Sequence, residues 1–64
     1  MPHSPIVALV KTIHYRGYIG YISRREDGTF HAHLDGGGGP ELSLQTEEEA
    51  QLDIETLVDE IEGD

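Results

Sequence analysis

The chain has 64 residues and no cysteine, and its 13 Asp and Glu residues against four Lys and Arg residues give a formal net charge of −9. This length predicts one small domain that buries roughly 60% of the surface exposed by its unfolded chain, held together without disulfides or thiolate zinc sites. The apolar run Ile6 to Val10 is shorter than the ~20 residues of a membrane span and follows no basic signal-peptide segment, so we expect a cytoplasmic protein.

Two strands are expected at the start of the chain, after a flexible leader at residues 1–5. Val7 to His14 is rich in β-branched and apolar residues, which favours a first strand. Gly17 then supplies a turn residue that accepts a positive φ, and Tyr18 to Ser23 predicts a second strand. These two segments therefore predict an antiparallel hairpin.

A third strand is predicted from Thr29 to Leu34, after the Asp27-Gly28 turn signal. Its residues alternate, so that Phe30, Ala32 and Leu34 face the core while Thr29, His31 and His33 face solvent. The glycine run at 36–39 and Pro40 predict a mobile loop. A short extended piece is expected from Leu42 to Gln45.

The C-terminal segment predicts a helix that begins with a capping box. In this motif the Thr46 hydroxyl accepts from the Glu49 amide and the Glu49 side chain reaches back to the Thr46 amide. Gly63 is expected to end the helix. The predicted fold is α+β, a three-stranded antiparallel sheet with one C-terminal helix packed on a face, formed by residues 6–62 with a tail at 63–64. The apolar stripe expected to contact the sheet is Ala50, Ile54, Leu57, Val58 and Ile61.

The opposite side of this helix carries carboxylates and no Lys or Arg. Like charges four residues apart, such as Glu49 and Asp53, repel each other, whereas an ordinary solvated helix mixes signs. A local rule that is broken in this way is typical of a functional surface. The acidic side chains are Glu47, Glu48, Glu49, Asp53, Glu55, Asp59, Glu60 and Glu62.

Leu52 lies in the middle of this acidic face, about 160° or more from the core residues Ile54 and Ile61. It is either an isolated surface leucine, which is common in soluble proteins, or an apolar anchor surrounded by charge, as in the centre of an interface.

No catalytic constellation is evident, because the serines, threonines and four histidines form no nucleophile and base pair. The glycine run lacks the Lys and Ser or Thr of a phosphate-binding loop. His31 and His33 share one strand face and would contribute two imidazoles to a metal site, with His14 or Asp35 as a third ligand, but no spacing fixes such a site. A small metal-binding accessory protein is therefore a further alternative. We therefore expect a protein that is not an enzyme and has no cofactor.

The charge distribution bears on the kind of partner. All four Lys and Arg residues, Lys11, Arg16, Arg24 and Arg25, precede residue 26, and all Asp and Glu residues lie from Glu26 onward. The strong negative charge argues against direct binding to nucleic acid, which depends on basic side chains. It is suited to steering the protein toward a positively charged cleft, or serves only solubility. We expect the basic residues, on or beside turns, to lie outside the binding surface.

Part of the chain resembles the HicB family of antitoxins. The resemblance rests on Tyr21-Ile22, on the run from Asp27 to Leu34, on the glycine-rich loop and on the Thr46 to Ala50 helix start, and it covers residues 18 to 62. It implies a module that neutralises a ribonuclease toxin by direct protein binding.

In size, charge and layout the whole chain is similar to small acidic phage-encoded anti-CRISPR proteins of the DNA-mimic type, most of all to inhibitors of type I-C systems. This resemblance implies an inhibitor, in the bacterial host cytoplasm, that binds the DNA-recognising large subunit of a type I CRISPR complex. The nine partner-binding residues would be the eight carboxylates named above and Leu52. An apolar first strand at a sheet edge is also suited to pairing between copies, so both a monomer and a homodimer are compatible with the sequence.

Overall fold

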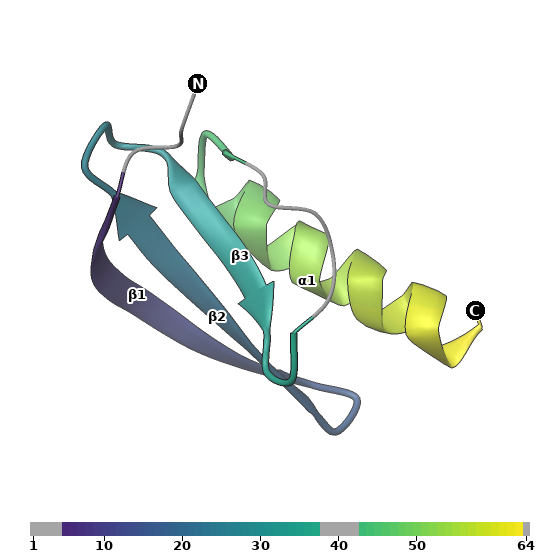
Figure 1. The fold of residues 1–64 in the computed structure, drawn as a ribbon. Helices are drawn as coiled ribbons and strands as arrows, with labels where there is room; N and C mark the ends of the chain where they lie inside the picture. The colour runs from purple at the N-terminus through teal and green to yellow at the C-terminus, as the bar shows by residue number, and fades with distance from the viewer. Residues whose placement is uncertain (1–4, 38–42, 64) are drawn as a thin grey trace.

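The computed structural model describes residues 5–37 and 43–63. An antiparallel sheet with the strand order β1-β2-β3 carries one helix, α1, packed across one face (Figure 1). The predicted α+β fold is therefore confirmed. The elements are β1 (Ile6–Tyr15), β2 (Tyr18–Arg25), β3 (Phe30–Leu34) and α1 (Glu47–Glu62).

The β1–β2 turn consists of two residues that both have positive φ. Arg16 has a φ of 52° and Gly17 a φ of 84°, while Tyr15 and Tyr18 face each other across the hairpin. Two left-handed residues in a two-residue loop match the twist of the flanking strands. Only Gly17 accepts this conformation without cost, because a non-glycine residue such as Arg16 loses about 1 to 2 kcal/mol in it.

The β2–β3 turn is stabilised by the Asp27 side chain. Its Oδ1 accepts hydrogen bonds from the Thr29 amide at 3.0 Å and from the Thr29 hydroxyl at 2.6 Å. Gly28 has a φ of 89°, which glycine tolerates without strain. The Asp-Gly signal thus marked the correct turn, although β2 extends two residues beyond the predicted end at Ser23.

The ends of the sheet are joined to the segments beside them. The Glu26 amide donates to the Pro5 carbonyl at 3.0 Å, so the last residue of the expected leader is held beside the β2–β3 turn. Leu44 forms an antiparallel bridge with Phe30 through two backbone hydrogen bonds of 2.8 and 2.9 Å. The remainder of the predicted leader, and residues 38–42 of the predicted loop and extended piece, lie outside the described residues.

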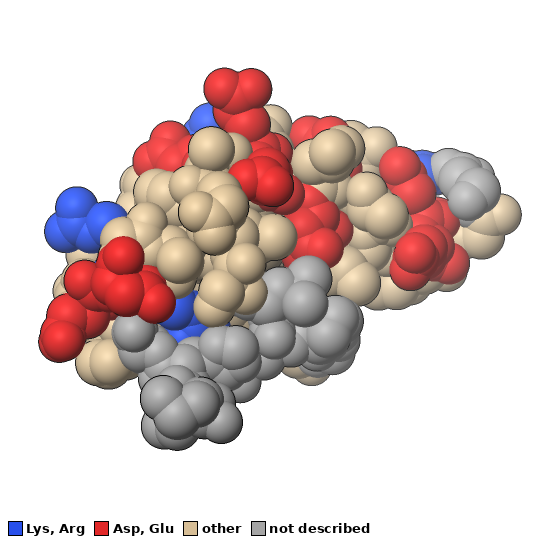
Figure 2. Space-filling model, turned by 90° about the horizontal axis from the view of Figure 1, so that it is seen from above, with Lys and Arg blue, Asp and Glu red and all other residues tan. Residues whose placement is uncertain are grey.

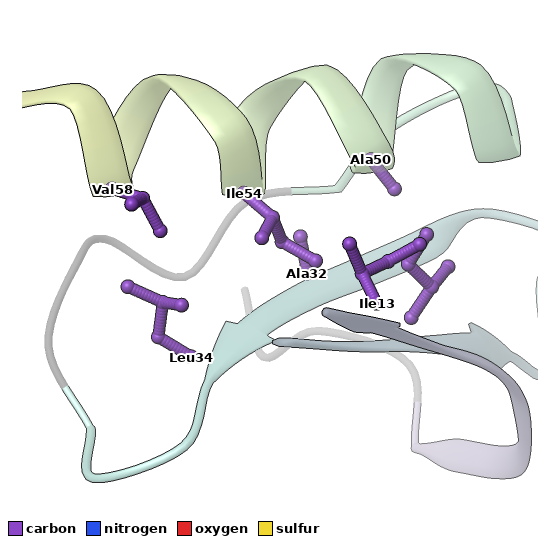
Figure 3. Close-up of a cluster of buried hydrophobic side chains, with 7 residues drawn as sticks. Ile13, Ala32, Leu34, Ala50, Ile54 and Val58 are labelled. Carbon is purple, nitrogen blue, oxygen red and sulfur yellow. The ribbon is translucent and has the colours of Figure 1, made fainter. Parts of the chain in front are cut away.

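The core lies between the helix and the sheet (Figure 3). Ala50, Ile54 and Val58 point from α1 toward Ala32 and Leu34 of β3. Ile13 of β1 and Ile22 of β2 complete the buried cluster, and Leu57 packs against it. Four of the five residues of the predicted apolar stripe therefore contact the core.

Ile61 is the exception, and its placement in the predicted stripe is wrong. Its side chain is 58% exposed. The 16 residues of α1 extend about 24 Å, whereas the five residues of β3 extend about 17 Å, so the last helical turn projects beyond the neighbouring strand (Figure 1).

In the described part of the chain, no helix has the length and apolar character needed to cross a membrane.

Gly20 is required where α1 approaches β2. A Cβ atom at Gly20 would lie 2.7 Å from Ile54 Cγ2 and 2.9 Å from Ile54 Cδ1. Ile54 is only 1% exposed and has no free space into which to move. The closeness of the helix to the sheet therefore depends on the absence of a side chain at position 20.

We predict that Gly20→Ala lowers the free energy of unfolding by about 1 to 3 kcal/mol, the usual effect of overpacking a core. Ile54→Ala alone should lower it by about 2 to 5 kcal/mol through the cavity it leaves. Because the second change removes the atoms that the first one meets, the double variant should lose clearly less than the sum of the two losses. Urea denaturation of the parent and the three variants measures this coupling, and strictly additive losses would contradict the close contact.

Candidate partner-binding surface

The predicted cap is present at the start of α1. The Thr46 Oγ1 atom accepts from the Glu49 amide at 3.1 Å. The Glu49 carboxylate accepts from the Thr46 hydroxyl at 3.4 Å, rather than from the Thr46 amide as the capping box predicts. Glu47, Glu48 and Glu49 are all exposed in the first turn, where the helix dipole favours negative charge.

The carboxylates of α1 do not form a uniform surface, because the helix turns them to two sides. At about 100° per residue, Glu55, Asp59 and Glu62 fall on the side toward the β1–β2 hairpin, and we call these three residues the hairpin flank. Glu49, Asp53 and Glu60 fall within about 40° of one another on the other side, and we call them the outer flank. The structure therefore separates the predicted site into two groups.

The hairpin flank is bound to the protein's own side chains. Asp59 Oδ1 accepts from Arg16 Nη1 at 2.8 Å and from the Tyr15 hydroxyl at 3.0 Å. Glu62 Oε2 accepts from the Tyr18 hydroxyl at 2.7 Å, and Glu55 accepts from Gln51 Nε2 at 3.2 Å. Asp59 and Glu62 therefore hold the helix on the hairpin, whereas the Glu55 contact lies within α1. All three carboxylates are partly occupied before any partner arrives.

The outer flank lies beside a shallow hollow of about 260 Å³. Leu44 and Leu52 give it an apolar wall, and Glu49, Asp53 and Thr56 form the remainder. The pKa of Asp53 is raised above its usual value, mainly because the carboxyl is partly buried and also because Glu60 is nearby, while His31 acts in the opposite direction. The ionised form of Asp53 is therefore stabilised less by its surroundings than that of an ordinary surface aspartate, and a cation placed beside it would relieve that cost.

Leu52 is the most exposed large apolar residue of the helix. Its side chain is 63% exposed, and it lies across the hollow from Leu44. It is thus not an isolated leucine among charges, because a second apolar side chain lines the same hollow. This arrangement is what the anchor hypothesis requires, with carboxylates of the outer flank at its border.

The basic residues also differ from one another. Arg24 is exposed, as expected, and Arg16 forms the ion pair with Asp59. Arg25, in contrast, is only 2% exposed, and its Nη2 lies 3.1 Å from His31 Nδ1. Replacing Arg25 would therefore disturb the fold, so the exposed residues Lys11 and Arg24, and not Arg25, are suitable for testing whether the basic residues bind a partner.

His31 and His33 form part of a ladder of rings along the sheet. The two imidazoles stack with centroids 6.0 Å apart, and Tyr21 stacks on His33 at 6.4 Å. Within residues 5–37 and 43–63, no cluster of three or more His, Cys, Asp or Glu residues is placed to hold a metal ion, so neither His14 nor Asp35 completes a site there. The geometry gives the metal-binding alternative no support.

Several residues that shape this surface were not identified from the sequence. Tyr15, Arg16 and Tyr18 bind the hairpin flank, and Leu44 and Thr56 line the hollow. The positive charge of Arg16 beside a turn was visible, but its contact joins residues 43 positions apart. No local sequence pattern predicts which carboxylate of a uniformly acidic helix will contact Arg16.

On the face shown in Figure 2, Asp and Glu residues form several separate areas among uncharged residues, and Lys and Arg residues appear only in a few smaller areas. Comparison with known proteins adds no relative to this picture. No family model matches the chain, and no curated protein or solved structure matches it. The functional argument therefore rests on the geometry of α1 and its surroundings.

We predict that stability falls at alkaline pH through Tyr15 and Tyr18. The pKa of Tyr15 is raised above 10.0 mainly by its hydrogen bond to Asp59, and that of Tyr18 mainly by its hydrogen bond to Glu62. A raised folded-state pKa means that each contribution is complete below pH 10.0 and is lost as the pH rises through the folded value. Thermal melting of the parent and of the Tyr15→Phe/Tyr18→Phe variant, from neutral pH to above this value, tests the effect.

The difference in melting temperature between the parent and this double variant should shrink above pH 10.0. A double variant with the same alkaline slope as the parent would contradict the role of these two phenols.

Proposed function

We propose that the protein is a non-enzymatic inhibitor that binds a basic nucleic-acid-binding protein through the outer flank of α1. In this mechanism the carboxylates of Glu49, Asp53 and Glu60 occupy positions that phosphates take in the partner's channel, and Leu52 contacts an apolar group beside it. Inhibition results from occupancy, because the channel cannot hold the inhibitor and nucleic acid together. Glu47 and Glu48 lie outside the outer flank and add negative charge at the start of the helix, with Glu48 on the side of the hairpin flank.

The observation that carries the proposal is the contrast between the two flanks. Asp59 and Glu62 are bonded to the hairpin, whereas Asp53 is partly buried next to Glu60 and carries a raised pKa. A helix that needed acidic residues only for solubility would gain more by mixing them with lysines, because opposite charges four apart stabilise it by about 0.2 to 0.5 kcal/mol per pair. The outer flank is therefore a surface whose charge is better suited to a partner than to the isolated fold.

The candidate partner follows from the resemblance to acidic anti-CRISPR proteins. It is the DNA-recognising large subunit of a type I surveillance complex, most closely a type I-C complex, in the cytoplasm of a bacterial host during phage infection. The same surface would serve an antitoxin-like module that neutralises a basic ribonuclease. The two functions differ in the partner that is bound, so a binding measurement separates them.

We predict that removing charge from the outer flank abolishes binding, whereas the same change on the hairpin flank does not. The outer variant is Glu49→Gln/Asp53→Asn/Glu60→Gln, and the hairpin variant is Glu55→Gln/Asp59→Asn/Glu62→Gln. Each removes three carboxylates and changes the formal net charge from −9 to −6. Comparing the two variants therefore shows whether binding depends on where the carboxylates lie or only on how much charge is removed.

The measurement is equilibrium binding to the purified large subunit at low and high salt, with target DNA as competitor, alongside thermal melting. The outer variant should melt close to the parent temperature, because the relief of repulsion is offset by the loss of the Glu49 charge from the first helical turn and of its contact with Thr46. It should bind weakly at both salt concentrations. The hairpin variant should bind like the parent but lose up to about 1 kcal/mol of stability with the exposed Arg16–Asp59 pair. Equal binding by parent and outer variant would show that the acidic surface is only solvated.

Leu52→Ala should weaken binding by about 1 to 2 kcal/mol, as loss of an apolar hot spot does. Because the lost contact is apolar, this reduction should be nearly independent of salt, unlike the effect of the carboxylates. The melting temperature should hardly change, since the side chain is 63% exposed. Unchanged binding at either salt concentration would make Leu52 an ordinary surface leucine.

A further inference from the structure

The outer edge of β1 is an exposed strand with an apolar surface. β1 lies at one edge of the sheet, and no further strand among the described residues pairs with its outer side. At the opposite edge of the sheet, the outer side of β3 is partly paired, because Phe30 forms a bridge with Leu44. β1 is also the longest strand, with ten residues, and contains no proline and only one charged residue, Lys11. Natural sheets usually protect an exposed edge strand with prolines or charged residues, because the unpaired backbone groups of such a strand recruit other strands.

Four large apolar side chains are exposed along the first half of β1. Ile6 is 50% exposed, Val7 52%, Leu9 61% and Val10 39%. Ile6 pairs with Arg25 and Leu9 with Ser23, and these two β2 residues share one face because they are two positions apart. That face is opposite to the one on which Ile22 packs under the helix. Ile6 and Leu9 therefore form an apolar patch on the side of the sheet opposite to α1, next to the open edge.

Two irregularities in the pairing of β1 with β2 occur in the same stretch, between Ile6 and Ala8 and between Leu9 and Lys11. Each adds an extra residue on β1, Val7 in the first case and Val10 in the second. These two valines are not used by the pairing with β2, yet they are apolar and exposed. Bulges often protect an edge strand, but here they place apolar side chains at it, which favours contact over protection.

The charge of the molecule indicates which partner this edge can accept. β1 contains no Asp or Glu, and the described carboxylates lie on the β2–β3 turn, on the segment after β3 and on α1. Figure 1 shows β1 at the edge of the sheet farthest from α1. Two chains that each carry −9 repel each other in most orientations, and β1 is where they meet with the least repulsion.

We propose that β1 pairs antiparallel with β1 of a second copy, giving a twofold-symmetric dimer with one continuous six-stranded sheet. A twofold axis perpendicular to the sheet makes one strand complementary to itself, so the interface needs only this surface. The Ile6 and Leu9 patches of the two copies then lie next to each other on the same side. The acidic helices lie at the far ends, which leaves both outer flanks accessible.

The contact is smaller than a standard interface between proteins. A standard interface buries about 800 Å² on each partner, which is roughly a fifth of the 4146 Å² surface of this chain. The edge of one strand with four apolar side chains provides less than that. We therefore expect a weak dimer that dissociates on dilution, and a small monomeric core that gains stability as the protein concentration rises.

Sedimentation equilibrium over a range of concentrations tests the proposal with a matched pair of variants. Leu9 is 61% exposed on β1 and Ile61 is 58% exposed on α1, and replacing either with Lys changes net charge equally. Leu9→Lys should raise the dimer dissociation constant at least about tenfold. Ile61→Lys should leave it unchanged. A parent chain that is monomeric at all concentrations, or a dimer weakened only by Ile61→Lys, would overturn the proposal.

A second measurement does not depend on comparing stabilities. Because the natural sequence has no cysteine, single cysteines at Val7, Leu9, Val10 or Ile61 report only on contacts between copies. Under mild oxidation at least one of the three β1 positions should form a disulfide-linked dimer much faster than Ile61→Cys. Comparable rates at all four positions would show random collision and contradict strand pairing. Neither measurement involves the acidic surface, so the dimer and the proposed inhibition succeed or fail separately.

Discussion

Ile54 packs against the bare backbone of Gly20, and this contact sets the distance and the rotation of the helix on the sheet. Once Ile54 occupies that position, Ala50 and Val58 must face the same side, since they lie one helical turn before and after it. The rotation also decides where every carboxylate of α1 points. The division into a bonded flank and an open flank is therefore a consequence of one steric fit in the core.

This arrangement gives chemically similar residues different roles. Asp59 and Asp53 are six residues apart on the same helix. Asp59 meets Arg16 and Tyr15, so its charge helps to attach the helix to the hairpin. Asp53 lies beside an apolar hollow and near Glu60, so its charge is a burden on the isolated fold. A neutral residue at Asp53 would suit the monomer better, which makes its presence informative about what the surface contacts.

The fold was accessible from the sequence because its signals are local. Asp27-Gly28 marks one turn, Gly17 marks the other, and Thr46 marks the start of the helix. Each acts through its own backbone or through residues close to it in sequence. Ile61 was misplaced because periodicity shows which face a residue occupies but does not show where the underlying strand ends.

The candidate surface was only partly accessible for the same reason. The acidic face and the unusual position of Leu52 could be predicted from helical spacing. The partners of Asp59 and Glu62 could not, because they lie on a hairpin at the other end of the chain. Leu44 could not be assigned to the hollow either, since its place depends on a single bridge to Phe30.

The contacts between hairpin and helix also bear on how the chain reaches its folded state. The bond from Tyr15 to Asp59 spans 44 of the 64 positions, whereas the β1–β2 hairpin closes over a two-residue loop. A short loop closes early, and a contact of long sequence separation forms only after most of the chain entropy has been lost. A helix with so much internal repulsion gains little by forming alone. We therefore expect the hairpin to form first and the acidic segment to become helical as it docks on the hairpin.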